Sequence, residues 1–269
     1  MKLMQLALAT SILASIACGI VGSYVVTRRI TYIAGAISHC VRGGMCVARY
    51  MQVVHGWREF TPLWGAVFAA VLSALVIGLV SLRAKEREDT VIGAIWAVGM
   101  AIGVIFIAKT PGYDKDLMSY LFGNILMVST DDLWLLGGLN ALVVGTGLLF
   151  YNKFLAVCFD EEFARLRGIA VEFYYLLLLC LIALTVVVLV KVVGIILVIA
   201  LLTLPAATAG HFARTLMQMM LGATVICIAT TIGGLALSYQ PDLPAGATMI
   251  VLAGAIYVLS VIVNRIVKN

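Results

Sequence analysis

The sequence predicts an all-α polytopic membrane protein with eight to nine transmembrane helices. The first observation behind this prediction is composition. Of the 269 residues, 63% are hydrophobic and only 12% are charged, whereas soluble domains have about 45–50% apolar and about 25% charged residues. No soluble fold of this length could bury so much apolar surface. The composition therefore excludes a soluble enzyme and a nucleic-acid-binding protein, and we expect the lipid bilayer to surround the chain.

The second observation is a series of apolar runs of the length that crosses a bilayer as a helix, roughly 20 residues. These runs lie near residues 3–27, 62–82, 91–108, 133–151, 171–190, 192–210, 216–238 and 247–264. A ninth segment, 33–54, is long enough to cross but contains charged and polar side chains. We therefore predict a single transmembrane domain over residues 1–269, with eight clear spans and one polar span.

The first span has an alternative interpretation as a cleaved signal peptide. Lys2 precedes an apolar stretch that leads to Ser15-Ile16-Ala17-Cys18, which is faintly similar to a lipoprotein cleavage site. The apolar run continues to Val26, which makes it longer than the roughly 7–15 apolar residues of a signal peptide. We therefore interpret residues 3–27 as a span.

The distribution of lysine and arginine predicts which side of the membrane each loop faces. With nine spans, one set of loops and ends carries eleven basic residues and the other set carries four. The eleven are Arg28, Arg29, Arg83, Lys85, Arg87, Lys153, Arg165, Arg167, Arg214, Arg265 and Lys268, and the four are Lys2, Arg58, Lys109 and Lys115. Since cytoplasmic loops are enriched in these residues, we expect the N-terminus outside and the C-terminus in the cytoplasm.

The polar span 33–54 carries the side chains that point most directly to transport. Helical spacing places one stripe of residues on a single face: Gly35, His39, Arg42, Cys46 and Arg49. Ionisable groups at membrane depth are costly, so they usually face a bundle interior or a wet cavity and mark a pathway. Imidazole and thiolate bind transition-metal cations, so His39 and Cys46 are candidate stations for a transported cation. The alternative is that His39 joins two helices through a hydrogen bond.

A charged connection between two spans predicts a short cytoplasmic helix within residues 158–168. An aspartate that can act as N-cap, glutamates in the first turn and a terminal glycine are the start and stop signals of such a helix. A phenylalanine and a leucine three residues apart supply an apolar edge. The residues concerned are Asp160, Glu161, Phe163, Ala164, Leu166 and Gly168. A helix this short is not stable alone, so we expect a packing partner; the alternative is a solvated loop.

Two more residues are candidates for the transport path. Asp242 lies in Asp242-Leu243-Pro244-Ala245-Gly246, before the last span, where it either draws cations to the outer mouth or caps the helix that follows. Pro205 lies within the run 192–210 and predicts a helix kink, which would free a backbone carbonyl toward a cavity.

The sequence contains no motif for catalysis or for a resident cofactor. It has no G-x-x-x-x-G-K-[ST] stretch, so we do not expect the chain to hydrolyse nucleotide by itself. Its three histidines are scattered, and its six cysteines include no C-x-x-C pair, which argues against both a structural zinc site and a disulfide framework. We therefore predict a transport subunit and no enzyme.

Several stretches together resemble the permeases of the ABC transporter family that imports zinc, manganese or iron(II). The matching stretches are Tyr24-Val25-Val26-Thr27-Arg28-Arg29, Gly35-Ala36-Ile37-Ser38-His39, Phe122-Gly123-Asn124, residues 160–168, residues 193–209 and Asp242-Leu243-Pro244-Ala245-Gly246. They occur in the same order as in the family and cover nearly the whole chain. The resemblance implies the permease subunit of an importer in the inner membrane of a prokaryote.

The resemblance also implies partners and residue roles. It implies a second copy of this chain or a paralogous permease, a separate cytoplasmic ATP-binding subunit, and an extracytoplasmic metal-binding protein. Residues 158–168 then correspond to the coupling helix, which docks on the ATP-binding subunit, and His39 corresponds to a histidine of the metal path. This sequence departs from the family at Gly35, where an aspartate is frequent, and at Arg42, where an apolar residue is frequent. The cation site is therefore either rebuilt from other spans or a weak transit point.

Two alternative functions remain at this stage. A gradient-driven secondary transporter or channel would typically show inverted repeats and intramembrane carboxylates, and the sequence shows neither. An intramembrane enzyme would need a catalytic cluster, such as two histidines on one helix face. Association with an ATPase separates the permease from both alternatives.

Overall fold

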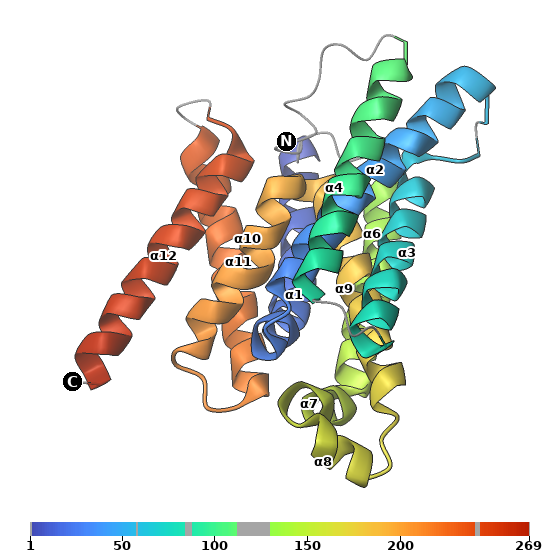
Figure 1. Ribbon diagram of the computed structural model, residues 1–269. Coiled ribbons are helices and arrows are strands. Elements are labelled where there is room, and N and C mark those ends of the chain that lie inside the picture. Colours follow the sequence, from blue (N-terminus) through green and yellow to red (C-terminus); the bar gives the residue numbers. More distant parts are fainter. Residues whose placement is uncertain (1, 58, 84–87, 112–129, 240–242, 269) are drawn as a thin grey trace.

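The computed structural model describes residues 2–57, 59–83, 88–111, 130–239 and 243–268, and these ranges are entirely helical apart from short connections. The helices are α1 Lys2–Arg28, α2 Thr31–His55, α3 Pro62–Arg83, α4 Glu88–Lys109, α6 Thr130–Leu149, α7 Tyr151–Phe159, α8 Glu161–Leu166, α9 Val171–Val193, α10 Ile195–Gly210, α11 Leu216–Tyr239 and α12 Ala245–Lys268. Figure 1 shows most of them side by side as one bundle, with α7 and α8 at one end. The all-α membrane fold is confirmed, and each of the nine predicted segments forms a helix.

The number of membrane spans is lower than predicted. Among the described residues, six helices are long and apolar enough to cross a bilayer, or seven if the bent pair of α6 and α7 counts as one span. The prediction of eight to nine spans is therefore too high by this criterion, for two reasons. Helix α10 has only 16 residues and is too short. Helix α2 is long enough, with 25 residues, but its polar stripe makes it less apolar than the helices that meet the criterion.

Helix α1 forms the centre of the bundle, and α4 and α12 lie at its periphery. Of the apolar stretch that could span the membrane, 72% of residues are buried in α1, compared with 17% in α4 and 22% in α12. Helix α1 packs against α6, α9, α10 and α11. Any displacement of α1 therefore reaches most of the bundle, because close-packed interiors transmit strain.

An aromatic cluster ties the end of α1 to the segment that connects α6 to α9. The buried Tyr24 hydroxyl donates a hydrogen bond of 2.9 Å to the carbonyl of Gly147. The Tyr24 ring meets Phe154 of α7 edge-on, with ring centroids 5.3 Å apart, and Phe154 also contacts Tyr174 of α9. Edge-to-face pairs of this kind stabilise packing beyond their buried area, so α7 is held firmly against α1 and α9.

The two ends of the chain lie at opposite ends of the bundle. In Figure 1 the start of α1 is at the top, whereas the end of α12 is at the bottom, on the side of α7 and α8. This arrangement places the exposed residues of α8 on the same side as the C-terminal helix end.

Candidate functional site

The polar helix α2 is buried because two apolar helices cover it. It packs against α3 and α4, and the contact with α4 is close because glycines face each other. A Cβ built on Gly43 would lie 2.5 Å from the carbonyl oxygen of Gly99 in α4. Small residues at such crossings allow membrane helices to approach, so the stripe that carries His39 and Cys46 faces α4.

His39 stacks on an aromatic side chain of α4. The imidazole ring and the Trp96 ring are nearly parallel, at an interplanar angle of 19° with centroids 4.6 Å apart. The Nδ1 atom of His39 is buried and has no hydrogen-bond partner among the described residues. Nδ1 therefore does not form the interhelical hydrogen bond of the structural alternative. Leaving a buried polar atom without a partner costs free energy of folding.

Cys46 and Arg42 lie on the same face as His39. Cys46 is 4% exposed, and a Cβ built on Gly103 of α4 would lie 3.8 Å from its sulfur atom. The half-buried guanidinium group of Arg42 neighbours both His39 and Cys46 and makes no ion pair with a described residue. A fixed positive charge between two potential ligands disfavours tight binding of a dication.

One chain does not assemble a closed metal site from its described residues. No group of three histidine, cysteine, aspartate or glutamate side chains that could hold a metal ion is found among them. Asp242 lies outside the described residues, so the structure does not place it relative to His39. Pro205 lies inside the 16-residue helix α10, which begins after the break at Gly194.

The segment 158–168 comprises the end of α7 and the short helix α8, at one end of the bundle. Helices α6 and α7 are bent by 69° relative to each other, and the six-residue helix α8 follows α7. The carboxylate of Asp160 accepts a hydrogen bond of 2.9 Å from the backbone N–H of Phe163, as an N-cap residue does. The helix is therefore started by the side chain that the sequence indicated.

Gly168 ends α8 in a left-handed conformation. Its φ is +72°, and the N–H of Ile169 bonds to the carbonyl of Ala164 while the N–H of Gly168 bonds to that of Arg165. This pair of bonds is the Schellman motif, in which glycine is the usual residue at the left-handed position. The end of α8 is thus determined by its backbone as well as by its side chains.

The outer side of this segment carries large apolar side chains that the bundle does not cover. Phe163 is 48% exposed, Leu166 is 87% exposed and Phe159 is 67% exposed, whereas Ala164 is buried. The Arg167 guanidinium lies over the Phe163 ring, 4.8 Å from its centroid. Exposed apolar side chains gathered on a short, rigid element are typical of a protein–protein contact. We call Phe159, Phe163 and Leu166 the docking edge.

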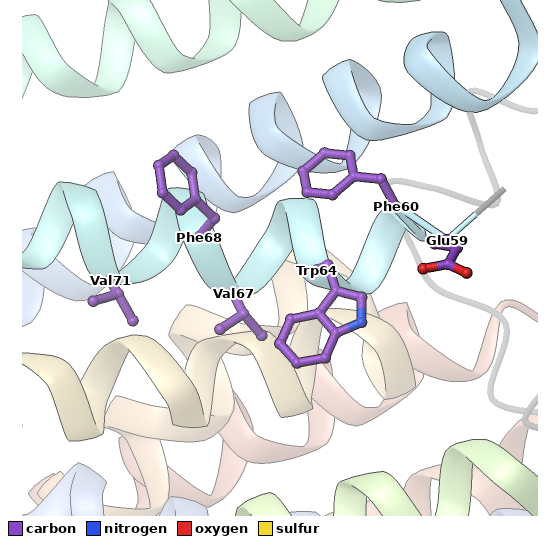
Figure 2. A pocket seen from close by; sticks show the side chains of 6 residues that line it. All are labelled: Glu59, Phe60, Trp64, Val67, Phe68 and Val71. Carbon is purple, nitrogen blue, oxygen red and sulfur yellow. The ribbon is translucent and has the colours of Figure 1, made fainter. Parts of the chain in front are cut away.

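A groove of about 590 Å³ lies on another part of the surface, along the start of α3. Figure 2 shows the six side chains that line it, most of them on α3: Glu59, Phe60, Trp64, Val67, Phe68 and Val71. Glu59 contributes the one carboxylate, so these side chains offer no ligand set for a metal cation. The groove therefore shares neither residues nor ligand chemistry with the stripe of α2 that carries His39.

Sequence reasoning missed two residues of these regions. Trp96 was not singled out, because nothing in the apolar run 91–108 distinguishes the position that faces His39. Arg28 was included as a cytoplasmic charge and as part of a family-like stretch, but its ion pair with Glu161 was not predicted. Neither contact follows from helical spacing, because the partners lie on different helices.

Comparisons with known proteins agree on one family. The family model described as the ABC 3 transport family matches residues 1–264. A probable metal transport system membrane protein of Chlamydia trachomatis is 40% identical, over 94% of this chain and 86% of that protein. The manganese transport system membrane protein MntC of Halalkalibacterium halodurans is 35% identical, over 96% of this chain and 86% of that protein. A chain in the solved structure of PsaBC from Streptococcus pneumoniae in complex with Fab is 30% identical, with a TM-score of 0.85 over 97% of this chain and 91% of that one.

Proposed function

The chain belongs to the ABC 3 transport family, and from this premise we propose that it is the membrane-spanning permease subunit of an ATP-driven importer of divalent transition-metal ions. In this proposal a separate cytoplasmic subunit hydrolyses ATP, and an extracytoplasmic binding protein delivers the metal. The chain itself performs no hydrolysis. The observation that carries the proposal is the docking edge, because an ATP-driven permease needs a stable contact for its ATPase.

The cargo that we propose to test first is manganese. The relative from Halalkalibacterium halodurans is named as a manganese transport protein, and it covers nearly the whole of this chain. Zinc and iron(II) are the other candidate cargoes, since imidazole binds zinc, iron and related divalent cations. A transit site has to bind weakly enough to release its ion. The positive charge of Arg42 near His39 and Cys46 fits weak binding.

We propose that two permease chains together form the path. The His39 stripe lies against α4, and only 17% of the apolar stretch of α4 is buried within one chain. A second copy or a paralogous permease that packs beside this region would supply the ligands that one chain lacks. In this arrangement His39 and Cys46 are transit ligands, Asp242 attracts cations at the outer mouth, and Pro205 kinks α10 beside the path.

We propose that the docking edge faces the cytoplasm of a prokaryotic cell and that the N-terminus lies outside. The positive-inside rule supports this orientation, since Lys153 lies in α7, Arg165 lies in α8, and Arg28 at the end of α1 contacts both helices. In this orientation the coupling helix, within residues 158–168, contacts the ATP-binding subunit. Asp160, Glu161 and Gly168 shape that helix, Ala164 packs it against the bundle, and Phe163 and Leu166 contact the partner.

The test is to express the tagged chain together with its ATP-binding subunit and to purify the complex from membranes. The expected result is a stable complex whose ATP hydrolysis increases when the metal-loaded binding protein is added. Competition among manganese, zinc and iron(II) during uptake then identifies the cargo. A chain that never retains an ATP-binding subunit, yet transports metal along an ion gradient, would support the secondary transporter instead.

A further inference from the structure

We propose that Arg28 is a positioning residue that makes α8 and the central helix α1 move as one body. Displacement of α8 by the ATP-binding subunit would then reach the transmembrane core through α1. This inference rests on the proposed docking role of residues 158–168 and adds the residue that transmits the movement. We call Arg28 and its contacts with α7, α8 and α9 the Arg28 clasp.

The clasp joins four helices through one side chain. One terminal nitrogen of Arg28, Nη2, forms an ion pair with the Glu161 carboxylate at the start of α8. The other, Nη1, donates a hydrogen bond of 3.1 Å to the carbonyl of Val157 in α7. The guanidinium carbon lies 5.4 Å from the centroid of the Tyr175 ring in α9. Each helix next to the docking edge is therefore in contact with the last residue of α1.

Arginine is suited to this position by its geometry. Its planar guanidinium group offers donors in fixed directions and can stack on an aromatic ring at the same time. Lysine carries the same charge on one nitrogen atom and does not reproduce the three contacts together. The side chains of Arg28 and Glu161 are only 23% and 33% exposed. The pair is therefore less screened than an open surface ion pair, which contributes little.

The position of Arg28 in α1 explains why its contacts matter for movement. Tyr24 lies one turn earlier on the same face of α1 and is fully buried against Phe154 of α7. Together the two side chains attach the end of α1 to the connection between α6 and α9 at two points. Because α1 packs against α6, α9, α10 and α11, a force applied to α8 is transmitted to the core and is not lost in a flexible loop.

The chain offers matched controls for both charges of the clasp. Arg29 is adjacent to Arg28 but exposed, and it follows the last residue of α1. Glu162 is adjacent to Glu161, is also in the first turn of α8 and is exposed. Replacing Glu162 changes the charge near the N-terminus of α8 as much as replacing Glu161 does. A difference between the two variants therefore reports the ion pair and not the helix dipole.

The experiment uses the complex of this chain with its ATP-binding subunit, reconstituted in proteoliposomes with manganese and the binding protein. The variants are Arg28→Gln, Glu161→Gln, the double variant and Arg28→Lys, and the controls are Arg29→Gln and Glu162→Gln. Four quantities are measured: the abundance of the chain in the membrane, the amount of ATP-binding subunit retained, the rate of ATP hydrolysis, and the number of manganese ions transported per ATP hydrolysed.

The proposal predicts that Arg28→Gln retains the ATP-binding subunit and its hydrolysis but transports roughly tenfold less manganese per ATP, on the scale of a lost charged hydrogen bond. Glu161→Gln should lower the number of manganese ions transported per ATP by a smaller factor, because the contacts of Arg28 with Val157 and Tyr175 remain. The double variant should be no worse than Arg28→Gln, and Arg28→Lys should be intermediate. Both controls should transport as much manganese per ATP hydrolysed as the wild type, because neither residue takes part in the contacts of Arg28.

A purely structural contact would give a different result. The abundance of the chain in the membrane would fall, but the complexes that remain would transport as much manganese per ATP as the wild type. That result, or an Arg28→Gln ratio equal to that of Arg29→Gln, overturns the clasp. If Arg28→Gln does not accumulate, wild-type manganese transport per ATP in Glu161→Gln overturns the clasp by itself, because glutamine keeps the shape of glutamate and removes only its charge. A wild-type chain that does not retain the ATP-binding subunit overturns the docking role, and the clasp with it.

Discussion

At the scale of single residues, His39 is held by an aromatic stack and not by a hydrogen bond at Nδ1. The ring lies against Trp96, and Nδ1 is buried without a partner among the described residues. A histidine that served only to fill space would not require a nitrogen atom there. The arrangement therefore separates two roles that substitutions can test independently: packing of the ring and donation by the nitrogen.

We predict that His39→Phe and His39→Ala both lower manganese uptake by roughly tenfold or more, as expected for a perturbed metal ligand. His39→Phe keeps an aromatic ring on Trp96 and should accumulate in the membrane as the wild type does. His39→Ala loses the stack, which is worth about 0.5–1.5 kcal/mol, so its abundance should fall moderately. Uptake per molecule is measured in both. Normal uptake by His39→Phe would show that the nitrogen atoms are not needed and that His39 is a packing residue.

Arg42 gives the second prediction at this scale. It neighbours His39 and Cys46 and pairs with no described carboxylate, so its charge opposes a passing dication. Arg42→Leu should leave abundance unchanged and should keep uptake at the wild-type level or raise it by up to roughly tenfold, which corresponds to about 1.4 kcal/mol. Arg42→Lys, which keeps the charge, is the control. A marked loss of Arg42→Leu from the membrane would instead indicate that Arg42 is paired and supports the bundle.

At the scale of elements, the docking edge depends on two features of α8: exposed apolar side chains and a defined helix end. Their contributions can be separated, since Phe163 contacts the partner in our proposal whereas Gly168 only shapes the backbone. Two predictions follow from this division, one for each residue.

We predict that Phe163→Asp abolishes retention of the ATP-binding subunit without reducing membrane abundance. The side chain is 48% exposed, so its replacement removes little packing within the chain. A carboxylate in an apolar contact would have to be desolvated on docking, which costs several kcal/mol. Phe212→Asp is the control, because Phe212 is 59% exposed and lies in the connection between α10 and α11, which is also at this end of the bundle. Retention of the subunit by Phe163→Asp would contradict the docking role.

We predict that Gly168→Val weakens coupling and that Gly168→Asn does not. The residue has φ +72°, a conformation that costs a non-glycine residue about 1–2 kcal/mol, and asparagine tolerates it better than a β-branched residue does. Coupling is measured as manganese transported per ATP hydrolysed. Equal behaviour of the two variants would mean that the backbone at the end of α8 does not determine docking.

The helices also show which features of the fold can be predicted from sequence patterns. Apolar length located every long helix, and the start and stop signals of 158–168 located α8, because caps are local features of the backbone. The two apolar runs 171–190 and 192–210 predicted a break near residue 191, whereas α9 ends at Val193 and α10 begins at Ile195, after Gly194. As a result α10 is shorter than a full span. The burial of α2 likewise depends on its packing against α4, which no single helix pattern encodes.

At the scale of the whole molecule, the contacts that give the site its properties join distant parts of the chain. His39 and Trp96 belong to α2 and α4, and Arg28 and Glu161 belong to α1 and α8. Helical periodicity indicates which residues share a face but not which face meets which neighbour. The sequence could therefore name His39, Cys46 and the docking segment as candidates, whereas Trp96 and Arg28 became visible only in the folded chain.

The central claim is that this permease moves a divalent metal with energy from ATP, and ATP-driven uptake into proteoliposomes tests it most directly. The permease, its ATP-binding subunit and the manganese-loaded binding protein are reconstituted, and manganese accumulation is measured with ATP, with a non-hydrolysable ATP analogue, and with a proton or sodium gradient alone. The account predicts accumulation against the manganese gradient with ATP and none under the other two conditions. Accumulation driven by the ion gradient without ATP would contradict it.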